Sequence, residues 1–149
     1  MRIESIQAVT DAALAHLEVD ELLSVLLPRI RQILDTDTCA VLLLDEATNE
    51  LVARQALGIE EEVGVRIPVG GGFAGRVAAT KEPVIIDDLD HYPVLNPILR
   101  QKHLRSMLGV PLLVGGKAIG VLHVGTLETR TFDEEDTELL QLVAARVAL

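Results

Sequence analysis

Two apolar segments separated by glycines constrain the fold of this chain more than any other part of its sequence. They are residues 107–114 and 118–124, and Gly115, Gly116 and Lys117 lie between them. Glycine adopts positive φ without steric cost, so Gly115 and Gly116 predict a tight reversal between two antiparallel strands. Neither segment alternates apolar with polar residues, so both faces of this hairpin must be covered. We therefore expect the centre of a sheet, with helices on one face and with loops around a cavity on the other.

The composition fits a single folded domain. Of the 149 residues, 49% are hydrophobic, which is enough for a core of its own. The net charge of −10 repels phosphate backbones and aromatics make up only 2%, so we expect no nucleic-acid partner. The single cysteine, Cys39, excludes an internal disulfide and fits a reducing compartment. No apolar run approaches the roughly 18 residues of a membrane span and no signal pattern begins the chain, so we expect a cytoplasmic protein without membrane contact.

Helical periodicity predicts helices at both ends of the chain. At the N-terminus it indicates one helix over residues 2–16 and a second from about residue 18 to residue 34, because the carboxylates of residues 18–21 favour a helix start. Asp133 and Asp136 have the spacing of a capping box before a last helix. The apolar stripe of that helix continues to the end of the sequence, which favours a longer parent protein.

Short apolar segments between these helices predict four further strands, over residues 39–44, 51–57, 65–69 and 83–86. Pro68 cannot donate to a neighbouring strand and therefore places the third of them near a sheet edge. We expect a short helix at residues 73–80. A long polar connection follows residue 86, and a turn or two of helix is expected at residues 98–105.

Five motifs occur here in the order and spacing of one known family. They are Ile67–Val77 (IPVGGGFAGRV), Glu82–Ile86, Arg105–Leu112, Gly120–Leu122 and Phe132–Asp136. Together with the order of elements, they resemble the GAF domain over nearly the whole chain. The resemblance implies one α+β domain over residues 1–149. Its central antiparallel sheet has five or six strands, with the terminal helices on one face and short helices and loops over a cavity on the other.

The resemblance also implies a function. GAF domains are sensory or regulatory modules, so we expect the N-terminal part of a longer signalling protein that controls a histidine kinase or serine phosphatase in the same chain. Ligand binding would order residues 87–105 and reorient the terminal helices. The apolar stripes of these helices could also pair in a homodimer, although they must first cover the sheet. A ligand-free dimerisation scaffold is the alternative.

The candidate pocket residues surround the cavity that the resemblance implies. His123 lies inside an apolar strand, which favours a hydrogen-bonded wall residue over a metal ligand. His91 and Tyr92 lie in the connection that often covers the ligand cavity in GAF domains. The complete candidate set is Phe73, Ile86, His91, Tyr92, His103, Ser106, Met107 and His123.

The known cofactors of the family do not match this sequence. Haem-binding members place an axial histidine where Gln101 stands, and His103 lies two residues away. Cyclic-nucleotide members carry an Asn-Lys pair where Thr126 and Leu127 stand, so the ion pair of that motif is expected to be missing. Bilin attachment needs a cysteine near Arg100. Haem, cyclic nucleotide and bilin are therefore disfavoured, and the expected ligand is an unidentified small molecule.

A glycine-rich segment and an acidic segment each resemble a known kind of binding site. Gly70, Gly72 and Gly75 match the dinucleotide fingerprint, but the helix after them is too short for a βαβ crossover, so we interpret them as a structural turn. An anion docked on the amides at that helix start is the lesser alternative. The acidic segment 87–91 lacks the spacing of a calcium loop and is interpreted as a solvated connection without a metal.

We expect no enzyme activity. One branch of the GAF family reduces free methionine sulfoxide with several cysteines, whereas Cys39 alone cannot form the disulfide that this chemistry requires. Cys39 lies in an apolar segment with no cationic neighbour, which indicates a packing role. The sequence contains no catalytic Ser-His-Asp order, paired carboxylates or zinc spacing, so no catalytic residue is assigned.

Overall fold

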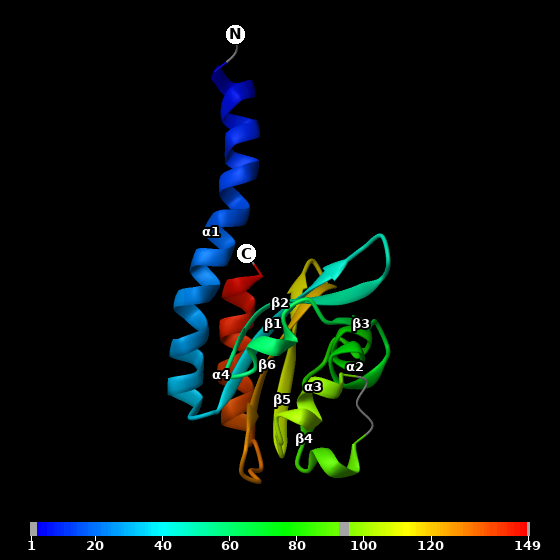
Figure 1. The fold of residues 1–149 in the computed structure, drawn as a ribbon. Coiled ribbons are helices and arrows are strands. Elements are labelled where there is room, and N and C mark those ends of the chain that lie inside the picture. The colour runs from blue at the N-terminus through cyan, green and yellow to red at the C-terminus, as the bar shows by residue number, and fades with distance from the viewer. Residues whose placement is uncertain (1–2, 93–95, 149) are drawn as a thin grey trace.

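A six-stranded antiparallel sheet forms the centre of the protein (Figure 1). The computed structural model describes residues 3–92 and 96–148, with side chains from residue 19 onward. The strand order is β3-β2-β1-β6-β5-β4, which confirms the expected α+β fold. The strands are β1 (Thr38–Asp45), β2 (Glu50–Leu57), β3 (Arg66–Pro68), β4 (Val84–Ile86), β5 (Ser106–Val114) and β6 (Lys117–Thr126).

The glycine-separated segments form the β5–β6 hairpin, as predicted. Gly115 and Gly116 have φ values of 57° and 78°, so the reversal uses the left-handed region that glycine adopts without strain. β6 also pairs with β1, and β5 pairs with β4. Both strands of the hairpin are therefore internal to the sheet.

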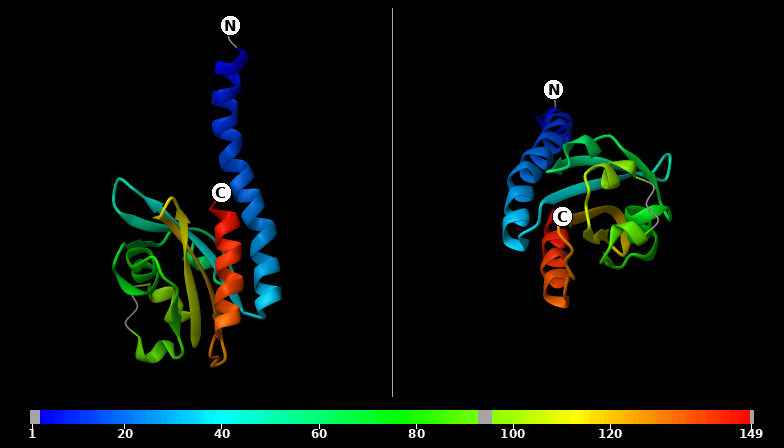
Figure 2. Two further views of the ribbon diagram at one scale, coloured as in Figure 1. Left: turned by 180° about the vertical axis from the view of Figure 1, so that it is seen from behind. Right: turned by 60° about the horizontal axis from the view of Figure 1, so that its bottom comes forward.

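Each face of the sheet carries its own core. Along β6, Leu122 and Val124 belong to the core beneath the long helices, whereas Val121 belongs to the core on the opposite face. The helices α1 (Ile3–Leu34) and α4 (Glu134–Val147) lie side by side on the first face (Figure 2). The second face is covered by η1 (Glu60–Glu62), α2 (Gly72–Thr80), η2 (Leu89–His91) and α3 (Pro97–Gln101).

The N-terminal region is one continuous helix, so the expectation of two helices is wrong. No glycine interrupts residues 3–34, and Pro28 lies within the helix. Asp20 does not mark a helix start: its carboxylate accepts a hydrogen bond of 2.8 Å from Arg54 of β2. A tertiary partner therefore explains this acidic residue inside the helix. The side chains of the first predicted helix, residues 2–16, lie outside the part of the structure that is described.

The capping box of α4 is confirmed. The Asp133 carboxylate accepts from the Asp136 backbone N–H at 2.8 Å, and the Asp136 carboxylate accepts from the Asp133 N–H at 3.1 Å. Two orphan donors at the helix start are thereby satisfied, which fixes where α4 begins. Among the helices of residues 3–92 and 96–148, none combines the length and the apolar character of a membrane span.

The glycine-rich segment is a packing turn. β3 and β4 form opposite edges of the sheet, and α2 lies between them in sequence. Every strand pair is antiparallel, so the parallel crossover of a dinucleotide fold is absent from the described sheet. A Cβ atom on Gly75 would lie 2.3 Å from the carbonyl oxygen of Pro68. Close backbone approach therefore explains this glycine. The edge position of β3 confirms the expectation from Pro68.

Candidate functional site

A small cavity lies between the sheet and its cover of short helices, on the face opposite α1 and α4. Its volume is about 10 Å³, which is about the space of one water molecule. Apolar side chains form most of the wall, and three polar side chains converge on it. The lining residues are Leu42, Glu62, Ile67, Phe73, Ala74, Asn96, Leu99 and His123.

Glu62 is the central polar group of the cavity. Its side chain is completely buried, and its Oε1 atom lies 3.0 Å from the Nε2 atom of His123. Its Oε2 atom accepts a hydrogen bond of 2.8 Å from the Nδ2 atom of Asn96. A buried carboxylate without partners costs several kcal/mol. Both of its oxygens are partnered here, so the structure can retain this group.

His123 has one ring nitrogen with no partner. Its Nε2 atom contacts Glu62, whereas its Nδ1 atom is buried and has no hydrogen-bond partner among the described residues. The imidazole packs edge-on against the Phe73 ring, with a centroid distance of 5.8 Å and an interplanar angle of 73°. A buried ring nitrogen normally finds a partner, so Nδ1 is an unmet polar atom on a residue that lines the cavity.

Small residues on the neighbouring strands make room for His123. In the sheet register, Ala40 of β1 and Gly109 of β5 flank it. A Cβ atom on Gly109 would lie 2.6 Å from the Cζ atom of Phe73. The absent side chain therefore lets the phenyl ring approach the sheet beside the imidazole.

Two short elements position the other polar groups. Glu62 is the last residue of η1, whose turn is closed by a 2.9 Å hydrogen bond from its own N–H to the carbonyl of Ile59. Asn96 is the N-cap of α3, and its Oδ1 atom accepts from the Ile98 N–H at 3.0 Å. The cap uses only the amide oxygen, so the amide nitrogen remains free to hold Glu62.

The structure places two of the eight predicted pocket residues, Phe73 and His123, at the cavity. Ile86 and Met107 lie in the surrounding core, and Ser106 is buried elsewhere. The remaining three lie at or near the surface: His91 and His103 are exposed and Tyr92 is half-buried.

Sequence analysis missed Glu62 and Asn96. Glu62 follows two other glutamates in an acidic segment, and nothing in the sequence distinguishes it from them. Asn96 precedes Pro97, a combination typical of a helix start, so its capping role could have been found.

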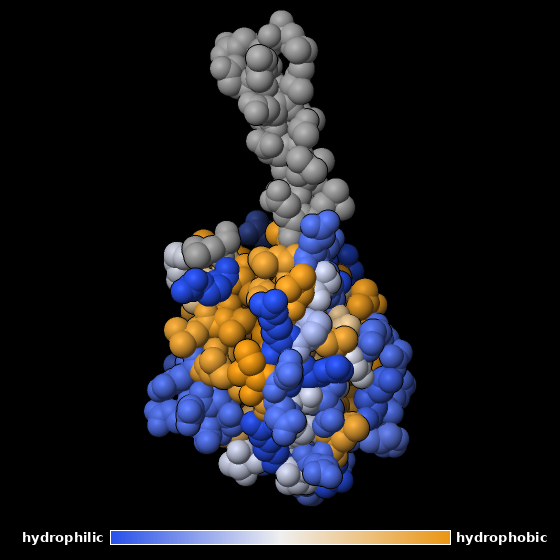
Figure 3. Space-filling model, turned by 90° about the vertical axis from the view of Figure 1, so that its left-hand side faces the viewer, coloured by the Kyte–Doolittle hydropathy of each residue, from blue (hydrophilic) through white to orange (hydrophobic). Residues whose placement is uncertain are grey.

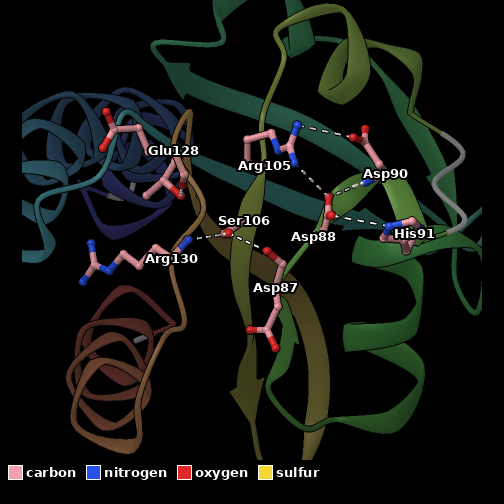
Figure 4. A network of polar contacts seen from close by, with 9 residues as sticks. Asp87, Asp88, Asp90, His91, Arg105, Ser106, Glu128 and Arg130 are labelled. Carbon is pink, nitrogen blue, oxygen red and sulfur yellow. Dashed lines mark hydrogen bonds and ion pairs between the residues drawn. The ribbon is translucent and has the colours of Figure 1, made fainter.

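The acidic segment after β4 is held by an arginine. Asp88 and Asp90 lie 3.7 and 3.4 Å from the Arg105 guanidinium, and His91 lies 3.6 Å from Asp88 (Figure 4). Within the described ranges, no three His, Cys, Asp or Glu side chains are grouped as a metal site. These carboxylates therefore serve as ion-pair partners.

The thiol of Cys39 lies in the core beneath the long helices. It is completely buried, and this burial raises its pKa to about 12, although Arg31 acts in the opposite direction. The thiolate is the nucleophilic form of cysteine. Cys39 is thus an unreactive thiol at neutral pH.

Asp136 does have a cationic partner, contrary to the expectation from Thr126 and Leu127. The Arg130 guanidinium lies 3.2 Å from the Asp136 carboxylate and stacks over Phe132 at 4.6 Å from the ring centroid. Arg130 lies three positions after Leu127, where the family's lysine would stand. A position-by-position comparison with the family motif therefore does not identify Arg130 as the partner of Asp136.

Comparisons with known proteins agree with this architecture. The GAF domain of a phosphoenolpyruvate-protein phosphotransferase from Coxiella burnetii superposes with a TM-score of 0.80 at 26% identity, covering 87% of this chain and 80% of that one. Free methionine-R-sulfoxide reductase from Neisseria meningitidis, solved with its substrate, gives a TM-score of 0.66 at 27% identity and covers 80% and 68%.

A curated regulator is similar in sequence. The formate hydrogenlyase transcriptional activator FhlA of Escherichia coli K12 is 26% identical over 151 residues, which are 95% of this chain and 22% of that protein. This chain thus spans about a fifth of the regulator's length. A family model described as GAF domain matches residues 16–149. Fold, motifs and family model agree: the chain belongs to the GAF domain family, whose members serve as regulatory modules in signalling proteins.

Proposed function

We propose that this domain senses a small molecule and regulates an output domain of a longer cytoplasmic signalling protein. The convergence of Glu62, Asn96 and His123 on one cavity supports this. Ligand sites typically combine apolar walls with a few placed polar groups. Replacing both members of a buried hydrogen-bonded pair by apolar groups of the same shape can be nearly neutral or stabilising, so fold stability alone gives little reason for this polar group.

The size of the cavity suggests how binding produces a signal. At about 10 Å³ the cavity accepts an occupant the size of water, so a larger ligand must displace part of the wall. Asn96 is the polar wall residue on the shortest α-helix, and two hydrogen bonds hold its side chain. A ligand that binds better when α3 is displaced shifts the population toward that arrangement. The connection 87–105 is the segment that moves in this proposal. Its residues 93–95 lie outside the described ones.

A thermal-shift screen tests the proposal. Wild-type protein is heated with a panel of amino acids, short-chain carboxylates and mononucleotides, and a ligand raises the Tm because it binds only the folded state. The shift should disappear in Glu62→Gln and persist in His103→Gln, a substitution at an exposed position outside the cavity lining. If no compound shifts the Tm and native mass spectrometry of freshly purified protein shows only bare chain, the sensor proposal is wrong.

The output domain is proposed from the family alone. The curated regulator described above is a longer protein of which this chain covers only 22%. A histidine kinase or a serine phosphatase is the expected output, because GAF domains commonly precede them.

We further propose that a second copy of this chain covers the outer face of α1 and α4. Apolar side chains gather on this face (Figure 3). Leu22, Val25 and Ile33 of α1 and Leu142 of α4 are all exposed. A contiguous exposed apolar surface of this kind typically marks an association site. Both helices also have their free ends at one end of the domain (Figures 1 and 2). Within one copy α1 and α4 run antiparallel. Two copies with their axes aligned would therefore form a four-helix bundle in which the two α1 helices are parallel to one another and antiparallel to the two α4 helices.

A ligand-free dimerisation scaffold is the second candidate function. The small volume of the cavity favours it, since the domain's own side chains nearly fill the space. The two candidates differ in the screen above: the scaffold gives no ligand-dependent Tm shift but still gives a dimer mass in native mass spectrometry.

Reduction of methionine sulfoxide is not proposed, although one structural neighbour is such a reductase. The only cysteine is buried and holds its proton at neutral pH, and the disulfide step needs a second thiol. Purified protein should show no thiol-dependent turnover of free methionine sulfoxide.

A further inference from the structure

A polar chain links the cavity side of the domain to the terminal helices. It begins at residues 87–92, which we call the strap. The strap is anchored to the start of β5, where the Leu89 N–H donates to the Arg105 carbonyl at 2.7 Å. The Leu89 side chain is buried in the same core as Phe73 and Leu99, which line the cavity. The strap therefore shares its packing with the cavity wall.

The Ser106 hydroxyl connects the strap to the segment that leads from β6 into α4. It is completely buried. Its Oγ atom donates to the Asp87 carbonyl at 2.7 Å and accepts from the Arg130 N–H at 2.8 Å (Figure 4). The hydroxyl thus bridges two segments that do not follow one another in sequence.

Arg130 continues the chain to both terminal helices. Its Nη1 atom donates to the carbonyls of Leu34 and Asp35, at 2.6 and 3.0 Å, at the C-terminal end of α1. Its Nη2 atom donates to the Asp136 carboxylate at 3.2 Å, in the first turn of α4. One arginine therefore holds the end of one helix to the beginning of the other.

We propose that Ser106 couples the strap to Arg130, so that displacement of the strap loosens the grip of Arg130 on α1 and α4. The physical reason is the double use of one buried hydroxyl. When the strap moves, Asp87 withdraws its carbonyl, and the hydroxyl must find another acceptor or lose a bond. Reorientation of the hydroxyl then weakens the bond from the Arg130 backbone. The coupling deepens the proposed sensor function by giving a route from the cavity side to the terminal helices.

Amide hydrogen exchange of the full chain without ligand tests this coupling. Asp88→Ala releases the strap, because it removes the acceptor of the Asp90 N–H and a partner of Arg105. The amides of Thr36 and Thr137, hydrogen-bonded at the end of α1 and the start of α4, report on the helices. The matched control is Asp45→Ala at the β1–β2 turn. Its carboxylate also accepts a backbone N–H two residues on and pairs with an arginine.

Release of the strap should speed exchange of both amides about fivefold relative to the control, the lower end of measured couplings. Exchange is normalised to the Val121 amide, so that a global loss of stability cancels. In a Ser106→Ala background, Asp88→Ala should add less than about a twofold change. Ser106→Cys, whose thiol is a weak donor and acceptor, replaces the alanine variant if that one does not fold.

Two results would overturn the coupling. One is exchange in Asp88→Ala that matches the Asp45→Ala control. The other is an equal acceleration with and without the Ser106 hydroxyl. The exchange experiment contains no ligand, so neither result tests the sensor proposal. The thermal-shift screen tests that proposal separately, and its failure would not alter the exchange result.

Discussion

The Nε2 atom of His123 lies 3.0 Å from the Oε1 atom of Glu62, and both side chains are buried. The two residues are separated by 61 positions in the sequence. Only Asn96 gives Glu62 a further side-chain hydrogen bond in the described part of the chain. The contact therefore governs whether the carboxylate can remain in the core.

Removal of one partner should cost more than removal of both. His123→Leu leaves Glu62 buried with one donor and should lower the free energy of unfolding by about 3 kcal/mol. The double variant His123→Leu with Glu62→Leu should recover most of that loss, since it leaves no buried carboxyl oxygen without a partner. Urea unfolding measures both. Wild-type stability in His123→Leu would mean that the imidazole only borders the cavity.

Two glycines of the central hairpin, Gly109 of β5 and Gly120 of β6, should differ in their tolerance of a methyl group. In Gly109→Ala the new Cβ meets the end of the Phe73 side chain at 2.6 Å, whereas in Gly120→Ala it meets the Leu42 carbonyl oxygen at 2.4 Å. A ring can shift but a strand backbone cannot shift without breaking its pairing. We expect a loss of about 1–2 kcal/mol for Gly109→Ala and a larger one for Gly120→Ala. Equal denaturation midpoints would contradict this ranking.

Arg130 should contribute more to stability than the exposed Arg66. Arg66 pairs with Asp45 and Glu50 at the surface, where 47% of its side chain is exposed, so Arg66→Gln should leave the Tm nearly unchanged. Arg130→Gln removes bonds to two helix-end carbonyls as well as an ion pair. It should cost about 1.5–3 kcal/mol. Thermal melting of the two variants side by side makes the comparison.

Cys39 should make stability fall in alkaline solution. Its folded pKa, about 12, lies above the unfolded value of 9.0. The folded state therefore holds the proton longer, so the contribution is complete below pH 9.0 and decreases as the pH rises toward 12. The slope for one such group is roughly 1.4 kcal/mol per pH unit. Because other groups titrate in this range, the wild-type curve is compared with Cys39→Ala. Parallel curves would contradict the prediction.

A charge on the outer helix face should break the proposed dimer. Leu142→Glu places a carboxylate at an exposed apolar position of α4, and burial of that carboxylate in an interface costs several kcal/mol. Sedimentation velocity should then show a monomer, with the Tm of the isolated domain little changed. Ile85→Glu, at an exposed position on the edge strand β4, is the control and should remain dimeric. A wild-type monomer at high concentration would remove the dimer proposal.

Local chemistry accounts for the elements that could be predicted. Gly115 and Gly116 determine the hairpin because few other residues adopt positive φ so readily. Asp133 and Asp136 determine the start of α4, because both partners of a capping box lie within one turn. The continuous apolar character of β5 and β6 required cover on both faces, which predicted the two layers.

The failures have a common origin in contacts between distant segments. Asp20 resembles a helix-start residue until Arg54, 34 positions later, supplies its partner. Arg130 supplies the cation for Asp136 from outside the expected position. In both cases the local sequence indicates that a carboxylate requires a partner, but it does not identify the distant residue that provides it.

By itself, the sequence determined the sheet with cover on both faces, its central hairpin and the start of α4, since these depend on periodicity, turn conformation and capping over a few residues. Only the tertiary structure decided the cavity. Glu62 has the same local surroundings as the glutamates before it, and it becomes a core residue because strand register brings His123 to it and the packing of α3 brings Asn96. A buried carboxylate persists only where distant donors reach both of its oxygens, and that condition depends on the folded chain as a whole.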